Sequence, residues 1–171
     1  MMNDLYSPEA MAQLTAIRDT LTKEIEASGG SPQAPLLPRQ AMEGLYAMAH
    51  AAYSVEDYAQ AESLFQAMVL FASADPRGWL GLAGACEAQR KWADAVRGYA
   101  VVMGLTPGDP VAPFRMGVCL MAMGLPEQAQ GAFETAREAG EASGVAPTLA
   151  AYGRQARSML RLLESRKDTA R

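Results

Sequence analysis

The sequence repeats itself every 34 residues, and this period constrains the fold more than any other feature of the chain. Three copies align, and each aligned column keeps its residue type. Three columns hold small residues or aromatic rings: Ala49, Ala83 and Gly117; Ala61, Ala95 and Ala129; Phe65, Tyr99 and Phe133. Two more columns are mostly large and apolar: Leu45, Trp79 and Pro113; Met48, Leu82 and Met116. Agreement of five columns over three copies indicates a repeat architecture.

A 34-residue period with a small residue early, then Ala and an aromatic residue late, is typical of tetratricopeptide repeats. Each such repeat is a pair of antiparallel helices, in which the small residues allow close approach and the large ones fill the gaps. We therefore predict an all-α fold in which three repeats form a right-handed superhelical solenoid. The repeats are expected at about 42–75, 76–109 and 110–141. Helices are expected over 39–53, 57–72, 76–89, 92–105, 110–123, 126–140 and 147–166.

Several helix starts are marked by the sequence itself. Asp75 before Pro76 and Asp109 before Pro110 are expected to cap the first helices of the second and third repeats. The segment "SVED" (54–57) has the spacing of a capping box, which predicts that Ser54 caps the next helix.

The two flanks lack the repeat, so we divide the chain into 1–38, 39–141 and 142–171. The first part is predicted to hold an amphipathic helix over 8–27, followed by a Pro/Gly-rich linker. Its apolar stripe supplies the candidates for dimerisation: Met11, Leu14, Ile17, Leu21 and Ile25. The last part is expected to be a helix that caps the solenoid, with a basic tail that forms its solvent face rather than a nucleic-acid site.

Groups that usually carry catalysis are scarce in this sequence. It has one histidine, His50, and two cysteines, Cys86 and Cys119, which lie in apolar patterns typical of buried reduced thiols. There is no Cys-x-x-Cys pair and no Gly-rich phosphate loop. We therefore expect no enzyme activity, no metal site and no cofactor. The chain shows neither a signal peptide nor an apolar run long enough to insert into a membrane, so a cytoplasmic location is expected.

A partner is expected in the concave face of the solenoid, which the first helix of each repeat lines. Helical spacing places large apolar and aromatic residues on that face, as exposed apolar surface in a binding groove would require. Gly84 would let a ligand backbone approach closely. The alternative is that the N-terminal helix or a loop covers this face. The candidate partner-binding residues are Tyr46, His50, Tyr53, Leu80, Gly84, Glu87, Phe114, Val118 and Met121.

Three segments carry a resemblance to a known family: "LYAMAHAAYSVEDYAQAESLFQAM" (45–68), "WLGLAGACEAQRKWADAVRGY" (79–99) and "PFRMGVCLMAMGLPEQAQ" (113–130). They resemble the class II chaperones of bacterial type III secretion. The resemblance implies a cytoplasmic protein that binds an extended Pro-x-Leu-x-x-Pro-like segment of hydrophobic translocator proteins and keeps them soluble before export. It also implies that Tyr46 and Tyr53 are groove aromatics with Phe114 opposite, and that the N-terminal region takes part in a homodimer.

Other functions stay open at this stage. The main alternative is a generic tetratricopeptide-repeat scaffold or assembly factor with a different peptide ligand. A co-chaperone of the needle subunit and an enzyme are further alternatives. A clamp for a C-terminal carboxylate is disfavoured, because Tyr46 and His50 stand where such clamps use Lys and Asn. A further hypothesis is that "PLLP" of the linker occupies the groove of a neighbouring chain.

Overall fold

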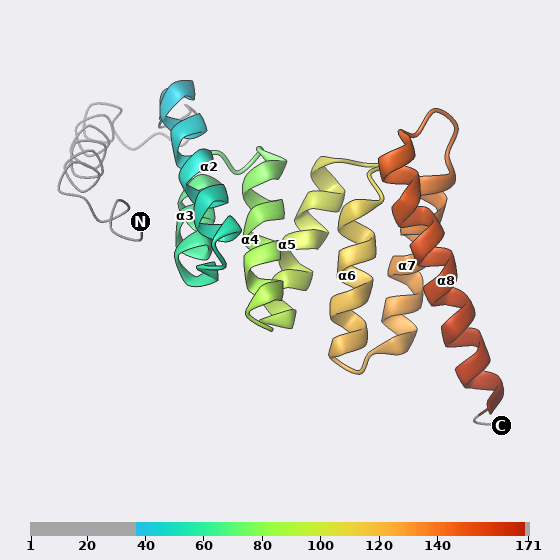
Figure 1. Cartoon of the computed structure of the whole chain (residues 1–171). Helices are drawn as coiled ribbons and strands as arrows, with labels where there is room; N and C mark the ends of the chain where they lie inside the picture. The colour runs from blue at the N-terminus through green and yellow to red at the C-terminus, as the bar shows by residue number, and fades with distance from the viewer. Residues whose placement is uncertain (1–36, 170–171) are drawn as a thin grey trace. The chain divides into compact units, whose positions relative to one another are not determined.

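The computed structural model describes residues 37–169, with side chains to residue 166, and this part of the chain is all-helical (Figure 1). Its helices are α2 (Arg39–Ser54), α3 (Tyr58–Phe71), α4 (Pro76–Ala88), α5 (Trp92–Leu105), α6 (Val111–Ala122), α7 (Pro126–Glu141) and α8 (Pro147–Thr169). Each matches a predicted helix to within three residues. The predicted helix over 8–27 and the dimerisation candidates lie outside the described residues.

From residue 44 onward, the described residues form one compact unit. Within this unit the helices pack in chain order: α3 on α4, α4 on α5, α5 on α6, α6 on α7 and α7 on α8 (Figure 1). The predicted all-α fold of stacked helical pairs is confirmed. The domain limits at 38 and 141 stay predictions. None of the helices in the described part of the chain is both long and apolar enough to cross a lipid bilayer.

The repeat columns form the contacts between helices, as their residue types predicted. All members of the Ala61, Ala95 and Ala129 column are fully buried, and the aromatic column is at most 2% exposed. A Cβ at Gly117 would lie 2.6 Å from the Phe133 ring, and one at Gly81 would lie 2.3 Å from the Phe65 ring. No side chain fits at either distance, so these glycines set the closest approach of first and second helices.

The turn inside each repeat has the same backbone form. Glu56, Arg90 and Gly124 lie 34 residues apart and have φ values of 64°, 60° and 74°. In each turn the next residue donates its N–H to the carbonyl five residues back: Asp57 to Ala52, Lys91 to Cys86 and Leu125 to Leu120, at 2.9–3.0 Å. This is the hydrogen bond of a helix that ends in a left-handed residue. The sequence period is therefore also a period of backbone conformation.

The predicted cap Asp75 is present, whereas Pro110 takes the cap position of α6 next to Asp109, and the predicted cap Ser54 is wrong. Asp75 Oδ1 accepts from the Arg77 N–H at 2.9 Å, and Asp109 Oδ1 accepts from the Val111 N–H at 2.8 Å. Ser54, in contrast, belongs to α2, and its hydroxyl donates to the His50 carbonyl at 2.8 Å. Asp57 caps α3 by accepting from the Gln60 N–H. The left-handed residue Glu56 ends the preceding helix after Ser54, which moves the cap three residues along.

The last helix, α8, lies against α7 through two glycines. A Cβ at Gly140 would lie 2.7 Å from Gly153 Cα, so the two backbones are nearly in contact at this crossing. Around it, α6, α7 and α8 share an apolar core: Leu120, Ala129, Ala132, Phe133, Ala136, Ala156, Leu160 and Leu163. This packing is what a helix that closes the last repeat requires.

Candidate functional site

A groove of about 450 Å³ lies along the first helices of the repeats. Helices α2, α4 and α6 supply most of its wall, with α8 in the place where the next first helix would stand. Second helices contribute only two buried rings, from α3 and α5. The lining residues are Tyr46, His50, Tyr53, Phe65, Arg77, Leu80, Gly81, Gly84, Tyr99, Val111, Arg115 and Tyr152.

Five of the predicted partner-binding residues line this groove: Tyr46, His50, Tyr53, Leu80 and Gly84. They occur at helical spacing on α2 and α4, as expected for one face of each helix. A Cβ at Gly84 would lie 3.5 Å from the Tyr53 hydroxyl, which is ordinary contact and not a clash. The glycine is therefore not required for packing and leaves open space beside the phenol.

The other four predicted residues do not line the groove. Glu87 lies beneath it, with a side chain only 10% exposed. Phe114 packs between two rings, with centroids 5.8 Å from Phe133 and 5.6 Å from Tyr152. Val118 and Met121 are half-buried against the core of α6, α7 and α8. Helix α6 is turned so that this stripe meets α7 and α8, and it presents Val111 and Arg115 to the groove instead.

Several lining residues were absent from the predicted site. Arg115 lies one helical turn after Val111, so continuing that face of α6 would have found it. Tyr152 lies on the helix that the sequence predicts only as a cap of the solenoid, and Phe65 and Tyr99 belong to the aromatic repeat column. Those predictions concern packing, and they do not reveal that the three rings also line the groove.

One cation of the groove is held by a carboxylate outside the lining. Arg77 donates from Nε and a terminal nitrogen to the Asp75 carboxylate, at 3.1 Å and 2.7 Å. The Arg77 guanidinium carbon lies 4.9 Å from the Tyr46 ring centroid, within the range of a cation–π contact. These hydrogen bonds from Arg77 hold the pKa of Asp75 below its ordinary value, although partial burial opposes the shift.

The second cation belongs to a chain of three side chains from three helices. Tyr99 donates its hydroxyl to Glu87 Oε2 at 2.6 Å, and Arg115 Nε lies 3.0 Å from the same oxygen. Burial, and then the hydrogen bond to Glu87, raise the pKa of Tyr99 well above its ordinary range. Burial also raises the pKa of Tyr53, against the opposing charge of Arg115. Both phenols therefore stay protonated at neutral pH.

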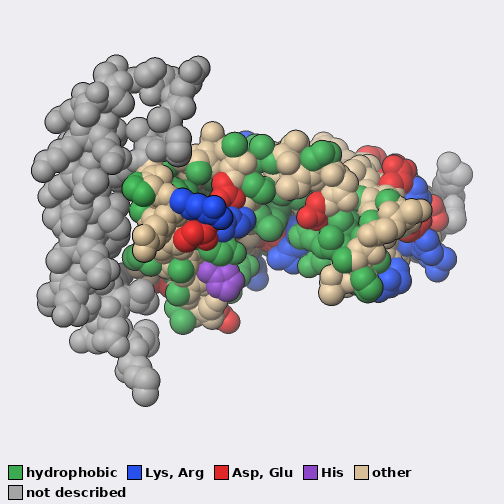
Figure 2. All heavy atoms as spheres, turned by 90° about the horizontal axis from the view of Figure 1, so that it is seen from above, with side chains coloured by type: hydrophobic (Ala, Val, Ile, Leu, Met, Phe, Trp, Pro, Cys, Tyr) green, Lys and Arg blue, Asp and Glu red, His purple; other side chains and the backbone are tan. Residues whose placement is uncertain are grey.

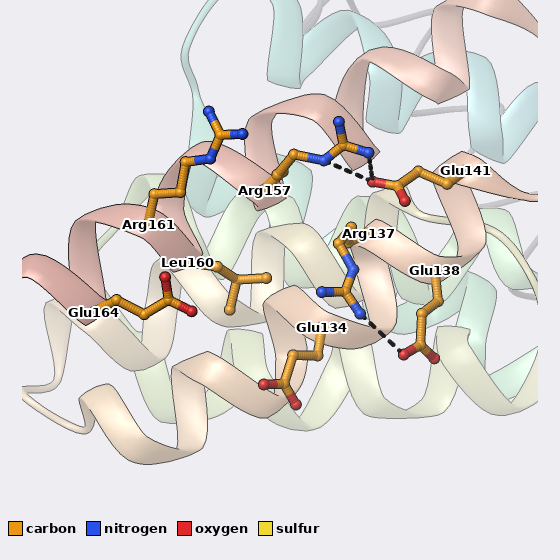
Figure 3. Close-up of a pocket in the computed structure, with 8 residues that line it drawn as sticks. All are labelled: Glu134, Arg137, Glu138, Glu141, Arg157, Leu160, Arg161 and Glu164. Atoms are coloured by element: carbon orange, nitrogen blue, oxygen red, sulfur yellow. Dashed lines mark hydrogen bonds and ion pairs between the residues drawn. The ribbon is translucent and has the colours of Figure 1, made fainter.

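A second hollow, of about 460 Å³, lies between α7 and α8 (Figure 3). Its lining is charged apart from Leu160: Glu134, Arg137, Glu138, Glu141, Arg157, Arg161 and Glu164. Arg157 bonds Glu141 at 2.5 Å, and Arg137 bonds Glu138 at 3.2 Å. Figure 2 shows charges of both signs gathered at the α8 end of the molecule. Such exposed pairs contribute little to binding or stability.

Neither cysteine is suited to react or bind metal. Cys86 and Cys119 are buried and unpaired, as predicted. Burial raises the pKa of the Cys86 thiol to about 11 and that of Cys119 to about 12. Across the described residues, no group of three or more His, Cys, Asp or Glu side chains is placed to hold a metal ion.

Comparison with known proteins leads to chaperones of type III secretion. No family model matches the chain. The chaperone protein SicA of Salmonella typhimurium is 29% identical over 102 residues, which are 60% of this chain and 62% of SicA. The match therefore spans less than two thirds of the length of this curated relative.

Two solved chaperones share the fold at 25% identity or more. PcrH, in complex with the chaperone binding region of PopD, is 26% identical, with a TM-score of 0.72 over 77% of this chain and 96% of PcrH. PcrH has also been solved from Pseudomonas aeruginosa. SycD of Yersinia enterocolitica, in complex with a peptide of the translocator YopD, is 25% identical, with a TM-score of 0.70 over 76% of this chain and 97% of SycD. SycD is also known in an alternative dimer. The predicted resemblance to translocator chaperones of type III secretion is confirmed.

Proposed function

We propose that this protein is a translocator chaperone of type III secretion, which binds an extended segment of a hydrophobic secreted protein in the groove of α2, α4 and α6. The observation that carries the proposal is the groove itself: five aromatic rings and two guanidinium groups line one open channel along the first helices. Its support from comparison is that PcrH and SycD were solved with segments of PopD and YopD bound.

The chemistry of the lining suits a proline-containing extended segment. Tyr46 and Tyr53 offer apolar ring faces with polar tips, on which proline rings stack well. A segment held extended by proline loses little conformational entropy when it binds. Leu80, which is 39% exposed, and Gly84 give a leucine of the ligand an apolar surface with room beside it. A Pro-x-Leu-x-x-Pro-like segment, which the resemblance implies, meets these requirements.

The mechanism that follows is sequestration. Occupying one short segment of the client keeps its membrane-seeking helices in a complex with a polar protein, without any covalent step. We propose that this takes place in the bacterial cytoplasm before export, that the protein is not an enzyme, and that it uses no nucleotide. We also propose a homodimer formed through the N-terminal stripe, since SycD adopts dimeric forms.

Calorimetric titration with synthetic Pro-x-Leu-x-x-Pro peptides tests this proposal. Wild-type protein should bind with micromolar affinity, and Tyr46→Ala/Tyr53→Ala should not bind while keeping its helical circular dichroism. The matched control is Val101→Ala/Leu105→Ala on α5, two exposed apolar residues outside the groove lining, which should bind as wild type does. A folded protein that binds no such peptide would contradict the proposal and leave a repeat scaffold with another ligand.

A further inference from the structure

The polar groups that face the groove are mainly hydrogen-bond donors. Its lining includes Arg77, Arg115 and His50, together with tyrosine hydroxyls, and none of the Asp or Glu residues that the structure describes is among the lining residues. The carboxylates that neutralise the two arginines, Asp75 and Glu87, lie behind the wall. A ligand in the groove therefore meets positive donors whose charge is already balanced from the other side.

The position of the Arg115 side chain in this wall is fixed by contacts with two other side chains. Its Nε pairs with Glu87 Oε2 at 3.0 Å, and Tyr99 fixes the same oxygen from below at 2.6 Å. Tyr99 is 1% exposed, so its hydroxyl has to find its partner inside the protein. A guanidinium has five N–H donors, and its contacts with Glu87 Oε2 and the Tyr99 hydroxyl engage only part of this set, so the guanidinium nitrogens keep donors for another acceptor. The Arg115 side chain is 39% exposed, which makes those nitrogens reachable from the groove.

From this arrangement we infer that Arg115 is a register-determining contact residue, which donates hydrogen bonds to a main-chain carbonyl of the bound segment and so fixes its position along the groove. The inference rests on the proposed function and adds the polar anchor to it. Glu87 already compensates the charge, so a neutral carbonyl satisfies the remaining donors, and a second carboxylate is not needed. Every extended peptide offers such carbonyls. The groove would therefore accept different sequences between its apolar anchor positions.

The first test compares peptide binding by wild type, Arg115→Met and Arg97→Met. Arg97 lies on α5, is 75% exposed and pairs with Asp94, so it is a matched arginine outside the groove. The probe is an uncharged synthetic peptide with one Pro-x-Leu-x-x-Pro segment. Arg115→Met should lose about tenfold in affinity, the loss expected for one charge-assisted hydrogen bond, and Arg97→Met should lose nothing. If Arg115→Met does not fold, Arg115→Lys takes its place. The lysine still pairs with Glu87 but lacks the planar set of guanidinium donors, so this variant should bind the peptide several-fold more weakly than wild type.

A second measurement separates direct contact from a structural role. Each amide of the peptide is replaced in turn by an ester, whose carbonyl is a weaker acceptor. At one position of the peptide, the ester should reduce the affinity of wild type several-fold more than it reduces the affinity of Arg115→Met. At every other position, the ester should reduce the affinity of both proteins equally. Unchanged affinity of Arg115→Met, or equal losses at every ester position, would overturn the inference while leaving the proposed function intact.

The alternative ligand group, a side-chain carboxylate, gives a different result. It would make the affinity fall steeply with salt, and replacement of Glu by Gln in a charged version of the peptide would abolish the effect of Arg115. That outcome would also overturn the inference. Wild-type protein that binds none of the peptides would overturn the inference and the proposed function together.

Discussion

Tyr99 donates its hydroxyl to Glu87 across the interface of α5 and α4, at the one aromatic column position that carries a hydroxyl. The equivalent residues Phe65 and Phe133 bury the same ring without a polar atom. The hydroxyl of the middle repeat is therefore not needed for packing. Its effect is to hold a nearly buried carboxylate in place under the groove.

Replacing Tyr99 by Phe should separate these roles. The ring will pack as in the neighbouring repeats, but Glu87 will lose a charge-assisted hydrogen bond, at a cost of about 2 kcal/mol in the free energy of unfolding. Urea denaturation followed by circular dichroism measures the change. An unchanged midpoint would mean that Glu87 finds another donor.

In the left-handed turns, introducing a glycine and removing one should change the free energy of unfolding in opposite directions. Arg90 has φ 60°, which is unfavourable for a side chain, so Arg90→Gly should raise the free energy of unfolding by up to about 1 kcal/mol. Gly124→Ala, at φ 74°, should lower it by about 1 kcal/mol. Thermal melts of the two variants beside wild type check both signs, and a loss of stability in Arg90→Gly would contradict the prediction.

Two glycines one turn apart on α4 should differ in what they tolerate. At Gly81 a Cβ would lie 2.3 Å from the buried Phe65 ring, so Gly81→Ala should destabilise the protein by about 2 kcal/mol. At Gly84 the new Cβ meets only ordinary contact, so Gly84→Ala should fold at least as well as wild type, since alanine favours a helix. It should still weaken peptide binding by filling the groove. Gly104→Ala, where a Cβ meets nothing within 4 Å, is the control for helix propensity alone.

Asp75 should contribute to acid sensitivity. Its pKa is lower in the folded protein than its ordinary value, chiefly through hydrogen bonds from Arg77. Its stabilising effect is therefore complete above the ordinary pKa of about 4 and is lost as the pH falls through the lower folded value. Asp75→Asn keeps a capping side chain but not the charge. The difference in urea midpoint between wild type and this variant should be present at pH 7 and shrink at pH 3. A difference in urea midpoint that does not change with pH would contradict the prediction, because it would mean that Asp75 stabilises the protein by capping α4 and not by its charge.

Most of the described fold could be predicted from the sequence because its determinants are local. The 34-residue period, the small-residue columns and the aspartates before Pro76 and Pro110 fixed the helices to within a few residues. The prediction for Ser54 is wrong because Glu56 adopts a left-handed conformation, which is uncommon for this residue type. Nothing in the segment "SVED" distinguishes such a turn from a capping box. The turn shared with Arg90 and Gly124 is evident only once the backbone is known.

The groove was predictable on α2 and α4 but not on α6. Along α2, the spacing of Tyr46, His50 and Tyr53 sets the face directly. On α6, Phe114 was expected in the groove, but it packs between Phe133 and Tyr152 and thereby turns the helix. Those two partners come from α7 and α8, beyond the helix itself. Helical periodicity within α6 carries no information on these long-range contacts, so it places Phe114 in the groove and does not reveal Tyr152.

The backbone crossing at Gly140 and Gly153 sets the position of one aromatic ring of the groove. Tyr152 precedes Gly153, and the close crossing of α7 and α8 brings its ring to the groove lining and against Phe114. Among the described helices, α8 contributes to the groove lining through this ring alone. Two glycines that are not lining residues therefore fix where the last helix meets the groove.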